Sequence, residues 1–146
     1  VRFGTTAATR AELASLLAPH ARVLAAAVER VRGRRQMTVR VRGKRPSPDR
    51  SSGSAYLASL VRAAALPEAD ALRRAVAKFL IDERVEPSPR AGFIGAVHHL
   101  VDARHVDAYL AAASAAGRRS PQKFVVTGPM MPFAFAPAID GAGDPS

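Results

Sequence analysis

The chain has 146 residues, no cysteine, and a net charge of +10 from 22 basic and 12 acidic residues. This length suits one domain with a single core, and the lack of cysteine excludes disulfides, thiolate zinc sites and cysteine nucleophiles. With 48% hydrophobic and 23% charged residues, the composition excludes collagen, coiled coils and wholesale disorder. No uninterrupted apolar run approaches the eighteen or so residues that a membrane-spanning helix needs.

The N-terminal part of the chain predicts a strand, two helices and a second strand. The stretch Val1–Ala7 is short and partly β-branched, which indicates a strand. Thr9 and Glu12 form a capping box at the start of a helix. Pro19 then opens a second helix that ends near Gly33. Residues 36–42 alternate between apolar and polar side chains, as a half-buried strand does.

A basic segment overlaps this second predicted strand. Between Arg30 and Arg50 the chain has nine basic residues and one acid, Asp49, and so carries +8 of the net charge. One interpretation is a solvated strand edge and loop. The other is a surface that attracts an acidic protein or a nucleic acid. Arg40 and Arg42, on the polar side of the strand, are its candidate partner-binding residues.

The rest of the chain predicts two more helices, a buried strand, a helix and a last strand. After a turn-rich loop, residues 56–65 favour a helix, and an apolar stripe over 72–80 predicts a longer amphipathic helix whose charged face extends to Glu86. The apolar run 93–101 reads as a buried strand.

The last predicted elements complete the fold. A helix begins after Asp102 and stops at Gly117, and residues 123–127 form the final strand. The order of elements predicts the α+β class, as a ferredoxin-like four-stranded antiparallel sheet with helices on one face and a helical insertion between the second and third strands. We expect one domain over residues 1–136 and a flexible tail over 137–146.

No set of residues predicts catalysis. His98 and His99 are neighbours on a strand, so their side chains point to opposite faces and cannot share a metal ion. His99 with His105 lacks further ligands. The serines of the loop at 51–54 have no neighbouring base, and no glycine pattern forms a phosphate cradle. We therefore predict no catalytic residues, no metal site and no cofactor.

The most informative segment is residues 126–135, Val-Thr-Gly-Pro-Met-Met-Pro-Phe-Ala-Phe. Its glycine and two prolines end the strand and send the chain onward in an extended path; they are Gly128, Pro129 and Pro132. Four large apolar side chains then follow on a non-helical stretch, namely Met130, Met131, Phe133 and Phe135. They either lock the segment onto the core or form a docking patch for an apolar partner.

This segment resembles the C-terminal end of the gas vesicle protein GvpL/GvpF family, which reads Leu-Thr-Gly-Pro-Trp-Pro-Pro-Tyr-Ser-Phe; Met130 and Met131 replace Trp and Pro. Three other stretches resemble the family in the same order: a first strand with Phe3 and Gly4, a helix start with Gly53, Tyr56 and Leu57, and a strand at 96–102. The match spans nearly the whole chain. We expect the central and C-terminal part of such a protein, without its N-terminal domain.

The resemblance implies an accessory protein of gas vesicle assembly, located in the cytoplasm or on the vesicle. It implies binding to the hydrophobic shell protein GvpA, and also to other accessory gas vesicle proteins, so that aggregation of GvpA is limited; it implies no enzyme activity and no cofactor. We expect the apolar side chains of 130–135 to hold the partner and Arg40 and Arg42 to attract it, with neither nucleic acid nor membrane as a partner. The alternative is an RNA-binding ferredoxin-like module that uses Arg30 to Arg50, because residues 90–97 faintly resemble the aromatic-glycine strand of RNA-recognition domains.

Overall fold

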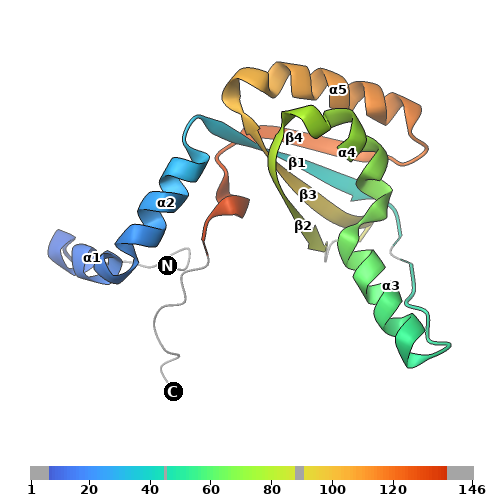
Figure 1. Cartoon of the computed structure of the whole chain (residues 1–146), viewed down its shortest axis with the longest axis horizontal. Helices are drawn as coiled ribbons and strands as arrows, with labels where there is room; N and C mark the ends of the chain where they lie inside the picture. Colours follow the sequence, from blue (N-terminus) through green and yellow to red (C-terminus); the bar gives the residue numbers. More distant parts are fainter. Residues whose placement is uncertain (1–6, 45, 88–90, 138–146) are drawn as a thin grey trace. The chain divides into compact units, whose positions relative to one another are not determined.

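The computed structural model describes residues 7–44, 46–87 and 91–137 (Figure 1). Its helices are α1 (Arg10–Leu17), α2 (Ala21–Val31), α3 (Gly53–Ala65), α4 (Asp70–Val76) and α5 (Val106–Arg119), and its strands are β1 (Arg34–Arg42), β2 (Leu80–Pro87), β3 (Phe93–Asp102) and β4 (Phe124–Met130). The chain divides into two compact units, Val1–Arg32 with Phe135–Ser146, and Gly33–Ala134. One domain over residues 1–136 stays a prediction, and the predicted tail lies outside the described residues after position 137.

The first unit contains α1 and α2. Thr9 caps α1, since its Oγ1 accepts the backbone N–H of Glu12 at 3.1 Å, and Pro19 lies in a short 3-10 turn before α2. Neither helix has a buried residue. Residues 10–31 are long enough and apolar enough to cross a membrane, with a mean hydropathy of 1.3 over a window of 18 residues. Core helices and signal sequences share both properties. The predicted strand at 1–7 lies outside the described residues except for Ala7.

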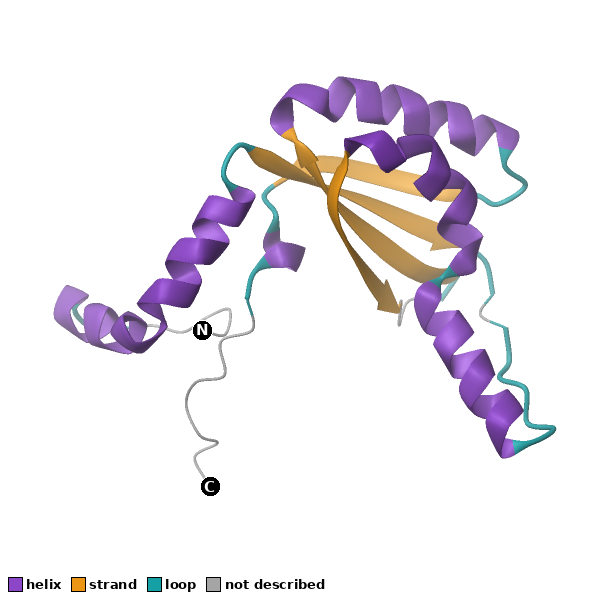
Figure 2. Ribbon diagram, viewed as in Figure 1, coloured by secondary structure: helices purple, strands orange, loops and turns teal. Residues whose placement is uncertain are grey.

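The second unit is built on a sheet with the strand order β2-β3-β1-β4, in which every neighbouring pair is antiparallel. The chain passes through β1, α3 and α4, β2, β3, α5 and β4 in turn. This order is the ferredoxin-like arrangement of two strand-helix-strand units. The predicted α+β class and four-stranded antiparallel sheet are therefore confirmed. Figure 2 shows α4 and α5 over the same face of the sheet.

One strand of this sheet was predicted wrongly. Residues 80–86 were expected to continue a helix, but Leu80–Pro87 is the edge strand β2. Its charged residues favour helix over strand by propensity. Pairing with β3, in which Val85 lies opposite Val97, overrides that preference. The insertion between β1 and β3 thus contains α3 and α4, as predicted, and also a strand.

The core lies between the sheet and its two covering helices. Met37, Val39 and Val41 alternate along β1 and are fully buried on the helix-covered face. Leu72 and Val76 of α4 and Tyr109 of α5 pack with Met37 and Val39 there, whereas Val41 packs with Leu66 and Val97. Burying a side chain of this kind contributes about 1.5–3 kcal/mol. The stripe predicted over 72–80 is therefore a core stripe, although its helix ends at Val76.

Two helix ends differ from the prediction. α3 begins at Gly53, where the family resemblance places a helix start and three residues before the start predicted from the pattern of 56–65, because the Ser52 hydroxyl accepts the N–H of Ala55 at 3.1 Å. α5 passes through Gly117 and ends at Arg119. A glycine interrupts a helix only weakly when the residues after it favour helix, as the two arginines here do.

Candidate partner-binding surface

The end of β4 needs a glycine at position 128. Gly128 has a φ of +126°, and a Cβ atom added to it would lie 2.7 Å from the carbonyl oxygen of Gln36 and 3.0 Å from the Met37 sulfur. The Gly128–Pro129 peptide bond is cis. These two distances show that β1 passes too close to Gly128 for any side chain at that position. The strand β4 ends two residues later, at Met130.

The four apolar side chains that follow have different surroundings. Met131 and Phe133 are 61% and 66% exposed. Met130 is half-buried, and Phe135 is only 2% exposed. The predicted patch is thus reduced to two side chains that a partner can reach.

Gln36 of β1 holds this segment through its side chain. Its Oε1 accepts the backbone N–H of Ala134 at 2.9 Å, and its Nε2 lies 3.7 Å from the Met130 sulfur. The same nitrogen donates to the Thr38 hydroxyl at 3.0 Å. No sequence prediction included Gln36; its signal is that, with Thr38, it is one of only two uncharged polar residues in β1.

Arg40 and Arg42 lie apart from Met131 and Phe133. Gln36 pairs with Met130 at one end of β1, whereas Arg42 is six residues further along, about 20 Å away at the rise of a strand. Arg40 donates to the Thr127 hydroxyl at 3.3 Å, and the Arg42 guanidinium lies 5.6 Å from the centre of the Phe93 ring. At the end of β1 that pairs with Met130, the exposed basic residue is Arg35, next to Gln36 in the strand.

His98 and His99 point to opposite faces of the sheet, as predicted. On the face away from α4 and α5, His98 bridges two strands: its Nε2 lies 2.9 Å from Glu86 and its Nδ1 3.0 Å from the Thr38 hydroxyl. His98 Nδ1 is also 3.2 Å from the Gln36 amide nitrogen. His98 therefore belongs to the polar network that positions Gln36.

His99 is fully buried on the other face, where its two ring nitrogens contact Tyr109 Oη at 2.6 Å and Glu83 at 3.0 Å. Arg73 donates to Glu83 at 3.0 Å and to Asp70 at 2.8 Å. The His99 hydrogen bond holds the pKa of Glu83 below its usual value, and Arg73 adds to that effect against the opposing effect of burial. Burial, followed by the charge of Glu83, raises the pKa of Tyr109.

This second histidine network braces the core. Because both of its ring nitrogens form hydrogen bonds, His99 has no free nitrogen with which to coordinate a metal ion. Among the described residues, no group of three or more histidine, aspartate or glutamate side chains is placed to hold a metal ion. The network links β2, β3, α4 and α5, and none of its residues lines the cavity beside α3 that is described next.

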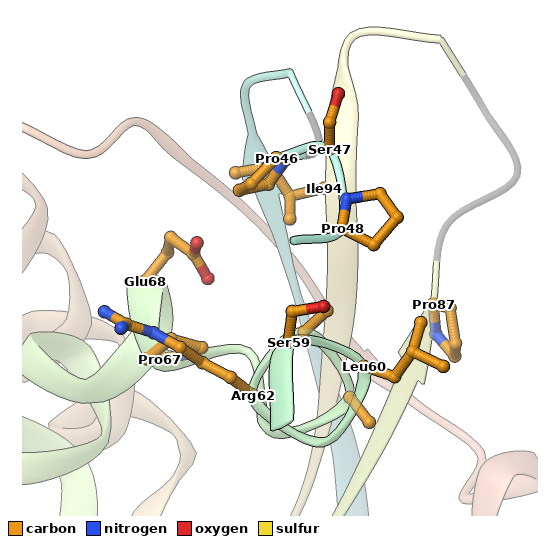
Figure 3. Close-up of a pocket in the computed structure, with 12 residues that line it drawn as sticks. Pro46, Ser47, Pro48, Ser59, Leu60, Arg62, Pro67, Glu68, Pro87 and Ile94 are labelled. Atoms are coloured by element: carbon orange, nitrogen blue, oxygen red, sulfur yellow. The ribbon is translucent and has the colours of Figure 1, made fainter. Parts of the chain in front are cut away.

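A cavity of about 520 Å³ lies beside α3 (Figure 3). Pro46 and Pro48 of the preceding loop lie across it from Ser59 and Leu60 of α3. The lining is largely apolar, and its titratable side chains are Arg62 and Glu68. The sequence predicts only a turn-rich loop before α3, and no sequence pattern indicates a cavity there.

Helix α3 also exposes apolar side chains. Tyr56, Leu57, Leu60 and Val61 are 40%, 63%, 43% and 71% exposed, and no residue of the helix is buried. A Cβ atom at Gly53 would meet nothing within 4 Å. Phe3 and Gly4, the other residues in the predicted structural motifs, lie outside the described residues.

The comparisons with known proteins agree with this architecture. Two solved structures share the fold at a TM-score of 0.70: the gas vesicle protein GvpF from Anabaena sp. PCC7120, at 11% identity over 99% of this chain and 68% of that one, and GvpF from Microcystis aeruginosa, at 12% identity over 94% and 69%. No curated protein matches the chain significantly. The family model described as gas vesicle synthesis protein GvpL/GvpF matches residues 1–137. The chain therefore belongs to the GvpL/GvpF family, and this membership supports a role in gas vesicle assembly.

Proposed function

We propose that this protein is an accessory factor that binds the hydrophobic shell protein GvpA in the cytoplasm or at the vesicle and limits its aggregation. Other accessory gas vesicle proteins are further partners under the same proposal. The observation that carries it is the exposure of Met131 and Phe133 on a segment whose backbone is fixed at both ends. Gly128 fixes one end and the hydrogen bond from Ala134 to Gln36 fixes the other.

The chemistry of this surface suits an apolar partner. Met and Phe are adaptable or large apolar side chains, and exposed apolar groups of this kind mark interaction sites. Fully burying each contributes about 1.5–3 kcal/mol, whereas association itself costs at least several kcal/mol. Two such side chains therefore favour a weak and reversible complex, which is the kind that a factor releasing its partner needs.

The proposal includes the absence of enzyme activity. Both histidines with carboxylate contacts serve packing or positioning: His99 is sealed in the core and His98 orients Gln36. The cavity beside α3 has serine hydroxyls but no histidine along its described lining. These observations support a protein that acts through contact surface.

Substitution of the two exposed side chains tests the proposal. In the double variant Met131→Asp with Phe133→Asp, GvpA should no longer co-purify, because two carboxylates would have to lose their hydration at the contact. Met130 is left unchanged because it is half-buried against Gln36. The matched control is Leu57→Asp with Val61→Asp on α3, where the side chains are equally exposed. Unchanged co-purification with the first variant, or equal loss with both, contradicts the assignment.

A further inference from the structure

We propose that the outer edge of β4 accepts an added antiparallel strand from a partner protein. The partner segment is extended and uncharged over about five residues, with apolar residues at alternate positions, and it ends at its C-terminal side in acidic residues. This surface is separate from Met131 and Phe133. The inference therefore does not depend on GvpA being the partner.

The two edges of the sheet differ in how they are protected. β2 carries Asp82, Glu83, Arg84 and Glu86 and ends at Pro87, and charges and proline are the usual means by which an edge strand avoids pairing with another chain. β4 has the sequence Phe-Val-Val-Thr-Gly-Pro-Met and no charged residue. Its one protecting residue, Pro129, lies near its end and leaves Phe124 to Thr127 open.

The hydrogen-bond pattern identifies the free backbone groups of β4. Arg42 donates its N–H to the carbonyl of Lys123 at 2.9 Å. Because paired and unpaired positions alternate along an antiparallel ladder, Val125 and Thr127 face β1. The N–H and C=O groups of Phe124 and Val126 then point outward, and no strand within the described ranges pairs with that side.

The charge around β4 selects the polarity of the added strand. Three exposed basic residues precede its N-terminal end, namely Arg118, Arg119 and Lys123, here called the basic end; the Arg42 guanidinium lies instead over Phe93 of β3. None of them forms an ion pair with a described residue. An antiparallel partner brings its C-terminal end to this point. Acidic residues there gain the attraction of three cations, and apolar residues before them lie beside Phe124 to Val126.

Amide exchange with two synthetic peptides tests this placement. The probe is Val-Thr-Val-Thr-Val-Asp-Asp, and the control has the reversed sequence; both are blocked at their ends. The probe should slow solvent exchange of the Phe124 and Val126 amides at least tenfold, while the amides of Val125 and Thr127, already paired, stay unchanged. The probe should also bind several-fold more tightly than the reversed peptide at low salt, with the difference shrinking at 0.5 M salt.

Two matched variants distinguish strand pairing at the β4 edge from nonspecific binding of the peptide. Val125→Lys places a charge in the middle of the open edge, on the face shared with Arg40, and should abolish the slowed exchange although it adds attraction for the aspartates. Ile81→Lys makes the same change on β2, where the side chain is 42% exposed, and should leave probe binding intact. Retained protection of the Thr127 amide shows that the β4 ladder survives in the Val125 variant.

Three results would overturn the inference: unchanged exchange at Phe124 and Val126, slowed exchange at β2 instead, or equal binding of the probe to both variants. Equal binding of the two peptides would overturn its antiparallel polarity. None of these outcomes bears on GvpA, whose co-purification is tested through Met131 and Phe133.

Discussion

The side-chain oxygen of Gln36 accepts the backbone N–H of Ala134, 98 residues later in the chain, at 2.9 Å. Gln36 is only 4% exposed, and its amide nitrogen is engaged with Thr38 and His98. A buried amide held on both sides fixes the direction of the backbone that it contacts. The exposed pair Met131 and Phe133 is therefore presented from a defined backbone rather than from a loose end.

Replacing Gln36 should loosen this segment. We expect Gln36→Leu to lower the free energy of unfolding by about 1–3 kcal/mol, because the Ala134 N–H loses its acceptor. Exchange of the Ala134 amide should accelerate, and co-purification of GvpA should weaken as the segment loses its fixed geometry. The control is Gln122→Leu, which removes a side-chain bond to the Arg42 carbonyl at the other end of β1. Equal effects of both variants on Ala134 exchange would argue against the tether.

Stability should depend on the ionisation of Glu83. Its pKa lies below the usual value of 4.5 because of its hydrogen bond with His99 and its contact with Arg73. A carboxyl whose pKa is depressed by folding contributes stability that is complete above its unfolded pKa, and this contribution is lost as the pH falls through the folded pKa. The wild-type free energy of unfolding should therefore decline below about pH 4.5 more steeply than that of Glu83→Gln.

At pH 7 the same variant should be less stable than the wild type by about 1–3 kcal/mol, because Arg73 and His99 lose a charged acceptor. Glu86→Gln is the control: this carboxylate lies on the same strand and contacts His98, but is 66% exposed and screened by solvent. Chemical denaturation between pH 3 and pH 7 measures both variants. Parallel pH profiles for the wild type and Glu83→Gln would show that the network contributes no pH-dependent stability.

The sequence predicted those helices and strands whose local residue pattern indicates the same structure that they adopt in the fold. The alternation of Met37, Val39 and Val41 marks β1, and the Thr9 capping box marks α1. Leu80 to Pro87 was misread because an edge strand with charges on both faces shows neither alternation nor an apolar run. Its identity depends on pairing with β3, which no local pattern contains.

The candidate surface was predictable only in part. The residue types over 126–135 identify the segment, but exposure depends on what packs against each side chain: Phe133 is 66% exposed and Phe135 2%. Gln36 could not be assigned, because its contact with Ala134 forms only when β1 and β4 pair. Arg40 and Arg42 share the polar side of β1 as expected, yet strand length places them far from Met131.

Two glycine substitutions should have opposite effects. Gly128→Ala forces a Cβ atom to within 2.7 Å of the Gln36 carbonyl oxygen at a φ of +126°, and should lower the free energy of unfolding by at least about 2 kcal/mol. Gly117→Ala is the matched control in α5, where the added carbon meets nothing within 4 Å. It should raise that free energy by about 0.5–1 kcal/mol. Thermal or urea unfolding measures both, and similar stability of the two variants would contradict the close approach at Gly128.

An RNA titration over a salt series separates the proposed function from the RNA-binding alternative. On the sheet face away from α4 and α5, the central strands carry Thr38 and Arg40 on β1 and Ala96, His98 and Leu100 on β3. These positions lack the paired aromatic side chains on which RNA-recognition sheets stack bases. Glu86 adds negative charge on the same face. We therefore expect only weak binding of single-stranded RNA, with no dependence on RNA sequence. The affinity should fall steeply between 50 and 200 mM salt, because the net charge of +10 would be its only source. Tight, sequence-dependent binding that persists at 200 mM salt and is lost in Arg40→Ala would instead establish the nucleic-acid reading of the basic segment.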